Sequence, residues 1–202
     1  PYMNLAEKMG CLAGQLVGSG FESLEITYGG TVADRDIRPV TISAIKGLLG
    51  CLLGDGIVNF VNAQRTLKDM GVKFLESKTE SANGYSNVIT LKIDKKGETT
   101  TVQGTVTGNK EKRIIRLNQY HTFIPSEGDM VIAVIEDKPN IIGPCCVVLG
   151  EGKINIGAMH VGRIAANEPQ LMVLSVDQMA SESIIKKLCE VPGVLSAKMV
   201  EL

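Results

Sequence analysis

The stretch MVIAVIEDKPNIIGPCCVVLGEGKINIGAMHVGR, from Met130 to Arg163, decides the fold of the second half of the chain. It opens with an apolar strand, Met130–Ile135, whose lack of alternation predicts that both faces are covered. A turn carrying Asp137, a short helix and a strand opened by Asn155 follow. The stretch holds no nucleophile–base pair and no metal-ligand spacing. We expect its polar groups and helix N-terminus to gather at one end of a small sheet, which suits a small zwitterion and indicates a sensor, not a catalyst.

The pattern of elements around this stretch predicts a ferredoxin-like unit. After Pro125–Asp129, which has the composition of a linker, the order is strand, helix, strand, strand, helix, strand. Residues 165–169 connect the two middle strands, and Ser181 caps the last helix. The order predicts a βαββαβ domain over residues 125–202.

The first half changes from helical to strand periodicity. Apolar residues recur at helical spacing over 4–17, after Thr41 and after Asn62, and 21–28 reads as a half-buried strand. Four more strands are predicted between residues 72 and 117, joined by short turns. Helices followed by an antiparallel meander indicate an α+β domain, which we place at residues 1–124.

Composition excludes several classes of protein. The net charge is -1 and aromatic residues make up 4%, which disfavours a nucleic-acid-binding surface. No apolar run reaches the roughly 20 residues that span a bilayer. The five cysteines show no CxxC spacing, so we expect buried thiols in a reducing cytoplasm and no metal. The start at Pro1, without an initiator Met or a signal peptide, suggests a piece of a longer chain.

The motifs resemble a known pair of domains. Residues 137–143, with Leu149–Glu151 and Ile154–Ile156, resemble an ACT domain, the amino-acid-sensing module. Upstream, residues 4–10, 58–63, 76–78, 104–106 and 113–121 resemble the intervening domain of long-form D-3-phosphoglycerate dehydrogenases. The resemblance covers essentially the whole chain, in the right order, and identifies it as similar to the C-terminal regulatory region of that family.

The resemblance implies a function for the longer protein. The intact enzyme would oxidise 3-phosphoglycerate with NAD to begin serine synthesis. No GxGxxG motif occurs here, so this region is expected to hold neither catalytic residues nor a cofactor. Serine would bind between two ACT domains and slow the catalytic half, and the chain would form a homodimer or a larger homo-oligomer.

The resemblance also assigns candidate effector contacts to Asp137, Asn140, Ile141 and Asn155. Asp137 can accept from the serine ammonium group, and Asn155 can donate to its carboxylate. The backbone N–H groups near Ile141 open a helix and suit the same carboxylate. Asn140 stands where the family prefers Gly, and Asn tolerates the left-handed backbone conformation. The structural alternative is that Asp137 forms an Asx-turn and Asn155 shapes the entry to a strand.

A second candidate site is basic. By motif, Arg113 and His121 align with contacts that the family uses for phosphorylated anions, and the Arg fork suits a phosphate. The alternative is that these residues decorate an exposed strand edge and discourage aggregation.

Two other functions remain open. The regulatory part of an iron–sulfur L-serine dehydratase resembles the same tandem arrangement, although the spacing here supplies no cluster cysteines. The other alternative is a freestanding amino-acid-binding module with no catalytic partner. The sequence preceding Pro1 would distinguish them.

Overall fold

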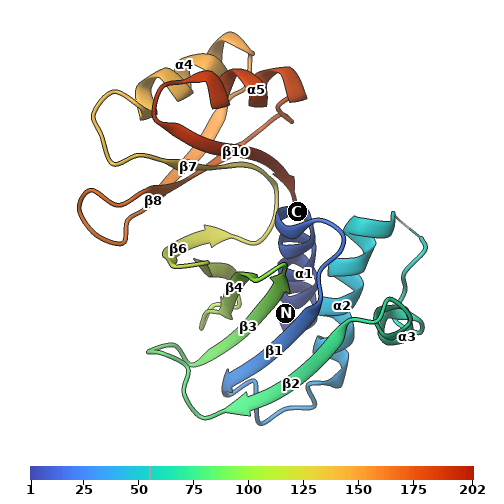
Figure 1. The fold of residues 1–202 in the computed structure, drawn as a ribbon. Helices are drawn as coiled ribbons and strands as arrows, with labels where there is room; N and C mark the ends of the chain where they lie inside the picture. Colours follow the sequence, from blue (N-terminus) through green and yellow to red (C-terminus); the bar gives the residue numbers. More distant parts are fainter. Residues whose placement is uncertain (55) are drawn as a thin grey trace. The chain divides into compact units, whose positions relative to one another are not determined.

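The computed structural model describes residues 1–54 and 56–202 and divides into two compact units (Figure 1). The first unit is Pro1–Asn118 and the second is Gln119–Leu202. The linker composition at Pro125–Asp129 placed the division after residue 124, whereas the contacts place strand β6 (Tyr120–Pro125) with the second unit. Each unit is described by itself.

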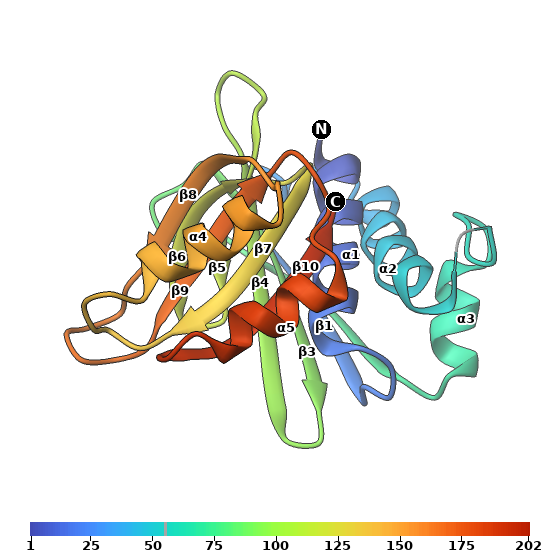
Figure 2. The same cartoon turned by 90° about the horizontal axis from the view of Figure 1, so that it is seen from above.

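The first unit is a sheet with two helices packed against one face (Figure 2). The strands that belong to this unit lie in the order β2-β1-β3-β4-β5. Helix α1 packs against β3 and β4, and α2 packs against α1. The elements are α1 (Tyr2–Val17), β1 (Ser23–Gly30), α2 (Arg38–Leu53), α3 (Ala63–Asp69), β2 (Lys73–Thr79), β3 (Asn87–Lys95), β4 (Glu98–Val106) and β5 (Lys112–Leu117).

The α+β class is confirmed, but one strand departs from the predicted meander. Strand β2 pairs with β1 in parallel, so that Ile26 lies opposite Glu76. The remaining pairs are antiparallel. Because α2 and α3 both lie between β1 and β2 in the chain, β2 returns beside β1 running the same way, as a helical crossover allows.

Helices α1 and α2 approach each other closely through glycines. A Cβ at Gly10 would overlap the carbonyl oxygen of Ala44, and one at Gly47 would overlap that of Glu7. The close approach buries Leu5, Met9 and Leu48 almost completely. Such packing of apolar side chains supplies most of the stability of a helix pair.

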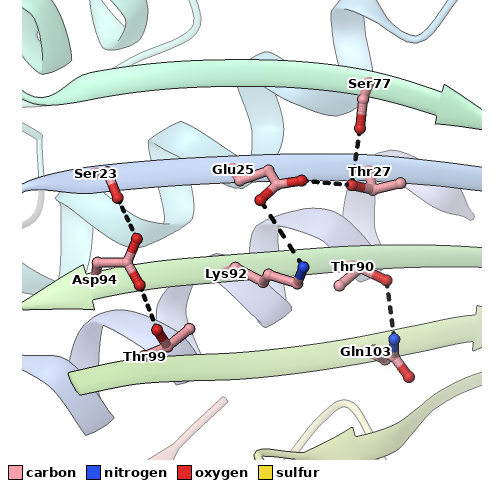
Figure 3. Close-up of polar contacts among 9 residues, drawn as sticks. All are labelled: Ser23, Glu25, Thr27, Ser77, Thr90, Lys92, Asp94, Thr99 and Gln103. Atoms are coloured by element: carbon pink, nitrogen blue, oxygen red, sulfur yellow. Dashed lines mark hydrogen bonds and ion pairs between the residues drawn. The ribbon is translucent and has the colours of Figure 1, made fainter. Parts of the chain in front are cut away.

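The other face of this sheet is polar (Figure 3). Alternate residues of β1 point away from the helices and contact their neighbours across the strands. Ser23 donates to Asp94 at 2.6 Å, and Lys92 lies 3.9 Å from Glu25. Thr99 also donates to Asp94, at 2.5 Å. Helices cover one face and hydrogen-bonded polar pairs cover the other, the alternation expected of an antiparallel sheet with a solvated side.

The expectation that all the cysteines are thiols is wrong for one pair. Cys11 on α1 and Cys51 on α2 form a disulfide, with their Cα atoms 5.5 Å apart. The reason is the close approach of the two helices, which brings together residues 40 positions apart. Cys145, Cys146 and Cys189 are free thiols.

The second unit contains the predicted βαββαβ fold. Its sheet order is β10-β7-β9-β8, with α4 and α5 on one face (Figure 1). The elements after β6 are β7 (Asp129–Ile135), α4 (Ile142–Glu151), β8 (Ile156–Gly162), β9 (Gln170–Val176), α5 (Glu182–Glu190) and β10 (Val194–Glu201). Strand β6, which the sequence did not predict, contacts β8 and β9.

The core of the second unit lies between its sheet and its helices. Val131, Ala133 and Leu174 from the strands meet Cys145 and Leu149 from α4, all buried. Strand β7 is central and almost wholly buried, which explains its unbroken apolar sequence.

Candidate functional site

Asp137 lies two residues after β7 and is held by the connection between β8 and β9. Its carboxylate accepts hydrogen bonds from the guanidinium of Arg163, from the backbone N–H of Asn167 at 2.9 Å and from the side-chain amide of Gln170. The Asp137 side chain is only 15% exposed. Within a single chain, Asp137 therefore stabilises the hairpin that joins β8 to β9.

These partners also keep Asp137 charged. The backbone N–H of Asn167 and the Arg163 side chain together hold the pKa of Asp137 below its usual value, against a smaller opposing effect of burial. An ionised carboxylate offers about four lone-pair positions. Three donors leave room for one further donor, such as an ammonium group.

The turn after Asp137 has the backbone that the sequence predicted. Asn140 adopts the left-handed conformation, with φ 62°. Ile141 is the N-cap residue of α4, and no side chain caps this helix. The Ile141 side chain is 4% exposed and belongs to the core, so only its backbone can face a ligand.

Asn155 lies just before β8 and has its own partners. Its side-chain amide donates to Asp177 at 2.5 Å, and its backbone N–H donates to the side-chain oxygen of Gln178 at 2.9 Å. The next residue, Ile156, pairs with Val176 at the end of β9. Asn155 therefore sits at the end of the sheet where β7 begins, because Val176 also pairs with Asp129.

The expected convergence of Asp137 and Asn155 is wrong within one copy of the chain. Strands β7 and β8 both pair antiparallel with β9, so they run in the same direction. Asp137 follows the end of β7, whereas Asn155 precedes the start of β8. The 7 residues of β7 separate these two ends, a length of about 20 Å at the rise of a strand.

Arg113 and His121 lie in different units. Arg113 is on β5, and its guanidinium donates to Glu111 at 2.9 Å. This hydrogen bond and charge hold the pKa of Glu111 below its usual value. His121 is an exposed residue of β6 in the second unit. A phosphate site formed by Arg113 and His121 stays a prediction.

The sequence reasoning missed Arg163 and Gln170, the two side chains that hold Asp137. A signal was available in the βαββαβ order, since that order makes the first two strands parallel and puts both of their C-terminal ends on one edge. Arg163 is the first residue after β8, and Asp137 is the second residue after β7.

Neither a metal site nor a membrane span is found in the described part of the chain. Among residues 1–54 and 56–202, no three His, Cys, Asp or Glu side chains gather closely enough to hold a metal ion. Within the same residues, no helix combines the length and apolar character needed to cross a bilayer.

Comparison with known proteins identifies the first unit. The family model of the D-3-phosphoglycerate dehydrogenase intervening domain matches residues 1–118, the extent of the first compact unit. The chain belongs to this family. The match confirms the resemblance seen in the upstream motifs.

Curated relatives extend the similarity through the second unit. The D-3-phosphoglycerate dehydrogenases of Archaeoglobus fulgidus and Bacillus subtilis are each 32% identical over 100% of this chain. That of Synechocystis is also 32% identical over 100% of the chain. The chain spans only 38%, 38% and 36% of these three relatives' own lengths.

Among solved structures, the C-terminal domain of the MgtC protein from Mycobacterium tuberculosis aligns with this chain. The alignment covers 35% of this chain and 82% of the MgtC domain. It is 14% identical with a TM-score of 0.29, values too low to indicate a shared fold.

Proposed function

We propose that the chain is the C-terminal regulatory region of a D-3-phosphoglycerate dehydrogenase and that its second unit senses serine. The match of the intervening-domain family and the similarity of three dehydrogenases over the full chain support this assignment. The longer enzyme would be an NAD-dependent oxidoreductase of serine biosynthesis working in the cytoplasm. The catalytic and NAD-binding parts belong to the remaining length of such a protein.

The serine pocket in this proposal is formed by two copies of the chain. Strand β8 is at the edge of its sheet, and among the described residues no strand pairs with its outer side. Met159 and Val161 on β8 are exposed apolar residues, 51% and 36% accessible. An exposed edge with apolar side chains is suited to pairing with another strand. A second copy paired through its own β8 would continue the sheet.

The direction of the strands makes this pairing favourable for a shared site. In an antiparallel β8–β8 pair related by a two-fold axis, the start of one strand lies beside the end of the other. The partner's Asn155 would then reach the end of the sheet where Asp137 and Arg163 lie. The single observation that carries the proposal is that Asp137 and Asn155 occupy opposite ends of one sheet, whose edge strand β8 has no strand paired with its outer side among the described residues.

Each group has a defined role in binding serine. The ionised Asp137 accepts from the ammonium group, with Arg163 fixing the carboxylate in place. The amide of Asn155 from the second copy donates to the serine carboxylate, aided by the uncapped backbone N–H groups at the start of α4. Serine would thereby hold the two copies in one arrangement, a coupling typically of about 1–3 kcal/mol.

Titration calorimetry with serine tests the contacts. Asp137→Asn and Asn155→Ala should each weaken serine binding about tenfold or more, because each removes a hydrogen bond to a charged group. Gln178→Ala is the control, since it removes the bond to the Asn155 backbone and leaves the Asn155 amide in place. If both site variants bind serine as the unaltered chain does, the pocket is wrong.

Sedimentation analysis tests the pairing. Met159→Lys places a charge on the free edge of β8 and should give a monomer that no longer binds serine. Leu195→Lys is the matched control, because Leu195 is 54% exposed on β10 at the opposite edge of the same sheet. A Met159→Lys chain that still dimerises would exclude pairing through β8.

A further inference from the structure

The two ends of the Cys11–Cys51 disulfide lie in unequal surroundings. Cys11 is a half-buried residue in the middle of α1, whereas Cys51 is exposed in the last turn of α2. A thiolate that breaks a disulfide must reach one of its two sulfur atoms. The difference in exposure therefore favours attack at Cys51.

A hydrogen-bond donor lies beside the sulfur of Cys11. The side-chain amide of Gln15 donates to Sγ of Cys11 at 3.2 Å. Gln15 comes one helical turn after Cys11, and side chains on a helix lean toward its N-terminus, so α1 itself holds the amide near the sulfur. A hydrogen-bond donor favours the charged form of the group that accepts from it. Gln15 would therefore stabilise a thiolate on Cys11, and a more stable thiolate leaves a disulfide faster.

The corresponding position after Cys51 has no side chain. Gly54, the C-cap residue of α2, lies three residues after Cys51, and residues three apart are neighbours on a helix surface. A Cβ at Gly54 would meet only Cδ1 of Ile57, at 4.0 Å, and a Cβ at Gly50 would meet nothing within 4 Å. These two glycine positions therefore leave room near Cys51 for an approaching thiolate.

The contact between α1 and α2 does not depend on the disulfide. A Cβ at Gly14 would lie 2.8 Å from the carbonyl oxygen of Leu48, so the backbones touch beside the disulfide. Glu7 on α1 also forms an ion pair with Lys46 on α2. Because these contacts remain when the sulfur–sulfur bond is broken, the two thiols stay close. Held neighbours react as if highly concentrated, which allows the bond to form again.

The other cysteines provide an internal comparison. Of the five cysteines, all of which the structure describes, only Cys11 and Cys51 are paired. Cys145 is buried, and burial raises the pKa of its thiol. Cys189 is an exposed thiol on α5. A reagent that exchanges with disulfides should therefore act on one pair and leave three thiols as a reference.

We propose that the Cys11–Cys51 disulfide is a reversible redox site that exchanges with a dithiol, with Cys51 as the sulfur attacked and Cys11 as the leaving thiolate. Three observations carry it together: the exposed Cys51, the Gln15 donor on Cys11 and the helix contact that outlasts the bond. Exposed disulfides are the ones that serve regulatory exchange, whereas shielded ones resist reduction. The proposal does not depend on serine binding to the second unit.

The exchange balances in two steps. A thiolate of the dithiol forms a bond to Sγ of Cys51 while the bond to Cys11 breaks, and the electron pair of that bond stays on Cys11, which takes a proton from water. The second thiol of the dithiol loses its proton to water and attacks the first sulfur of the same reagent. That attack closes the disulfide of the reagent and releases Cys51 as a thiolate, which is protonated in turn. Two electrons and two protons pass to the protein, and the oxidised dithiol reverses both steps.

Trapping with a monothiol tests which sulfur is attacked. The folded chain is exposed briefly to reduced glutathione, all thiols are then alkylated with N-ethylmaleimide, and peptides are identified by mass spectrometry. Glutathione lacks a second thiol, so the mixed disulfide persists. We expect glutathione on Cys51 at least about tenfold more often than on Cys11, with Cys11 alkylated. Equal labelling of the two cysteines, or more on Cys11, would overturn the assigned direction.

The rate of reduction tests the role of Gln15. Gln15→Leu should slow the reduction of the folded chain by dithiothreitol about fivefold, because the leaving thiolate loses one hydrogen bond. Gln64→Leu, at an exposed position of α3, is the control and should not change the rate. In urea both chains should be reduced as fast as the unaltered chain, since α1 no longer holds the amide near the sulfur. A Gln15→Leu rate that stays unchanged in the folded chain, or falls equally in urea, would exclude Gln15 as the stabilising group.

Reversibility is tested by equilibrating the chain with mixtures of reduced and oxidised dithiothreitol. We expect one transition between three and five thiols, the same curve from both directions, and a circular dichroism spectrum that keeps its helical signal throughout. Oxidised dithiothreitol should close Cys11 with Cys51 and leave Cys189 a thiol. A chain purified with five thiols that closes the pair in this way supports the site equally.

Two results would overturn the reversible site. One is that the folded chain is reduced only at its rate of unfolding, independent of dithiothreitol concentration, which would indicate a shielded structural bond. The other is that oxidised dithiothreitol fails to close the pair, or joins other cysteines instead. Serine titrations do not enter these measurements, so failure here and failure of the serine pocket are distinguishable.

Discussion

The guanidinium of Arg163 donates to the carboxylate of Asp137, joining the residue that follows β8 to the turn that follows β7. Asp137 was predicted as a contact for a ligand, and the structure shows that it also has a structural partner. The two roles are compatible because the carboxylate retains an acceptor position. The ion pair holds the ionised carboxylate of Asp137 in a fixed position at the end of the sheet.

Replacing Asp137 should reduce the stability of the chain in a pH-dependent way. Its pKa in the folded state is lowered, so its contribution is present above the ordinary Asp value of about 4 and is lost as the pH falls through the folded value. Urea unfolding should therefore show Asp137→Asn less stable than the unaltered chain at pH 7, with the difference shrinking toward pH 3. Asp129→Asn, at the other end of β7, is the control. A difference that stays constant with pH would contradict the charged pairing.

Two glycines of α2 should respond to alanine in opposite directions. A Cβ at Gly47 meets the backbone of Glu7, so Gly47→Ala forces the helices apart and should cost about 3 kcal/mol or more. Gly50 lies on the same helix with nothing within 4 Å of its Cβ position. Gly50→Ala should raise the free energy of unfolding by up to about 1 kcal/mol, through helix propensity alone. Denaturant unfolding of both variants measures this, and equal effects would contradict the close approach of α1 and α2.

Local patterns predicted most elements of this fold but not the pairings that join them. The apolar run Met130–Ile135 indicated a covered strand, and β7 is central and buried. Periodicity alone could not show that β2 lies parallel to β1. The sequence 120–125 was not recognised as a strand, although alternate residues of β6 are buried.

The start of α2 shows how tertiary contacts alter a local interpretation. The apolar spacing predicted a helix after Thr41, yet the helix begins at Arg38 with Pro39 in its first turn. The Thr41 hydroxyl is used by the core instead, because Tyr28 lies 2.7 Å from it. The candidate site shows the same limit. The sequence predicted that the polar groups gather at one end of the sheet, whereas the strand directions put Asp137 and Asn155 at opposite ends within one copy.

The buried pair of Tyr28 and Thr41 gives a third prediction. Both side chains are fully buried, and burial raises the pKa of Tyr28. Thr41→Val leaves the Tyr28 hydroxyl without this partner and should cost about 1–3 kcal/mol, the penalty for an unsatisfied buried group. Tyr28→Phe should cost only about 1 kcal/mol, since the single hydroxyl proton of Thr41 keeps an acceptor, either the carboxylate of Glu76 or the carbonyl of Ile37.

The double variant of this pair is the decisive measurement. Replacing both partners removes both polar groups, so Tyr28→Phe with Thr41→Val should cost less than the sum of the two single changes. Thermal unfolding of the four chains gives this interaction free energy. Costs that add within about 0.5 kcal/mol would show that the two hydroxyls do not interact.

The disulfide between Cys11 and Cys51 should stabilise the first unit by restricting its unfolded state. It closes a loop of 40 residues, for which the chain-entropy relation gives about 4 kcal/mol. Reduction should lower the stability of the first unit by up to this amount without unfolding it, because the helix pair retains its glycine contacts and the ion pair of Lys46 with Glu7. Urea unfolding with and without a phosphine reductant, followed by circular dichroism, measures the change.

Variants separate the disulfide from the free thiols. A chain with Cys11→Ala and Cys51→Ala should unfold at the reduced midpoint and no longer respond to the reductant. Cys189→Ala is the control, since Cys189 is a free, exposed thiol on α5 and the response to reductant should persist. Thiol titration of the unfolded, unreduced chain should find the three free cysteines and no more. Five titrating thiols, or a midpoint that reductant does not move, would instead support the reduced state that the sequence predicted for all the cysteines.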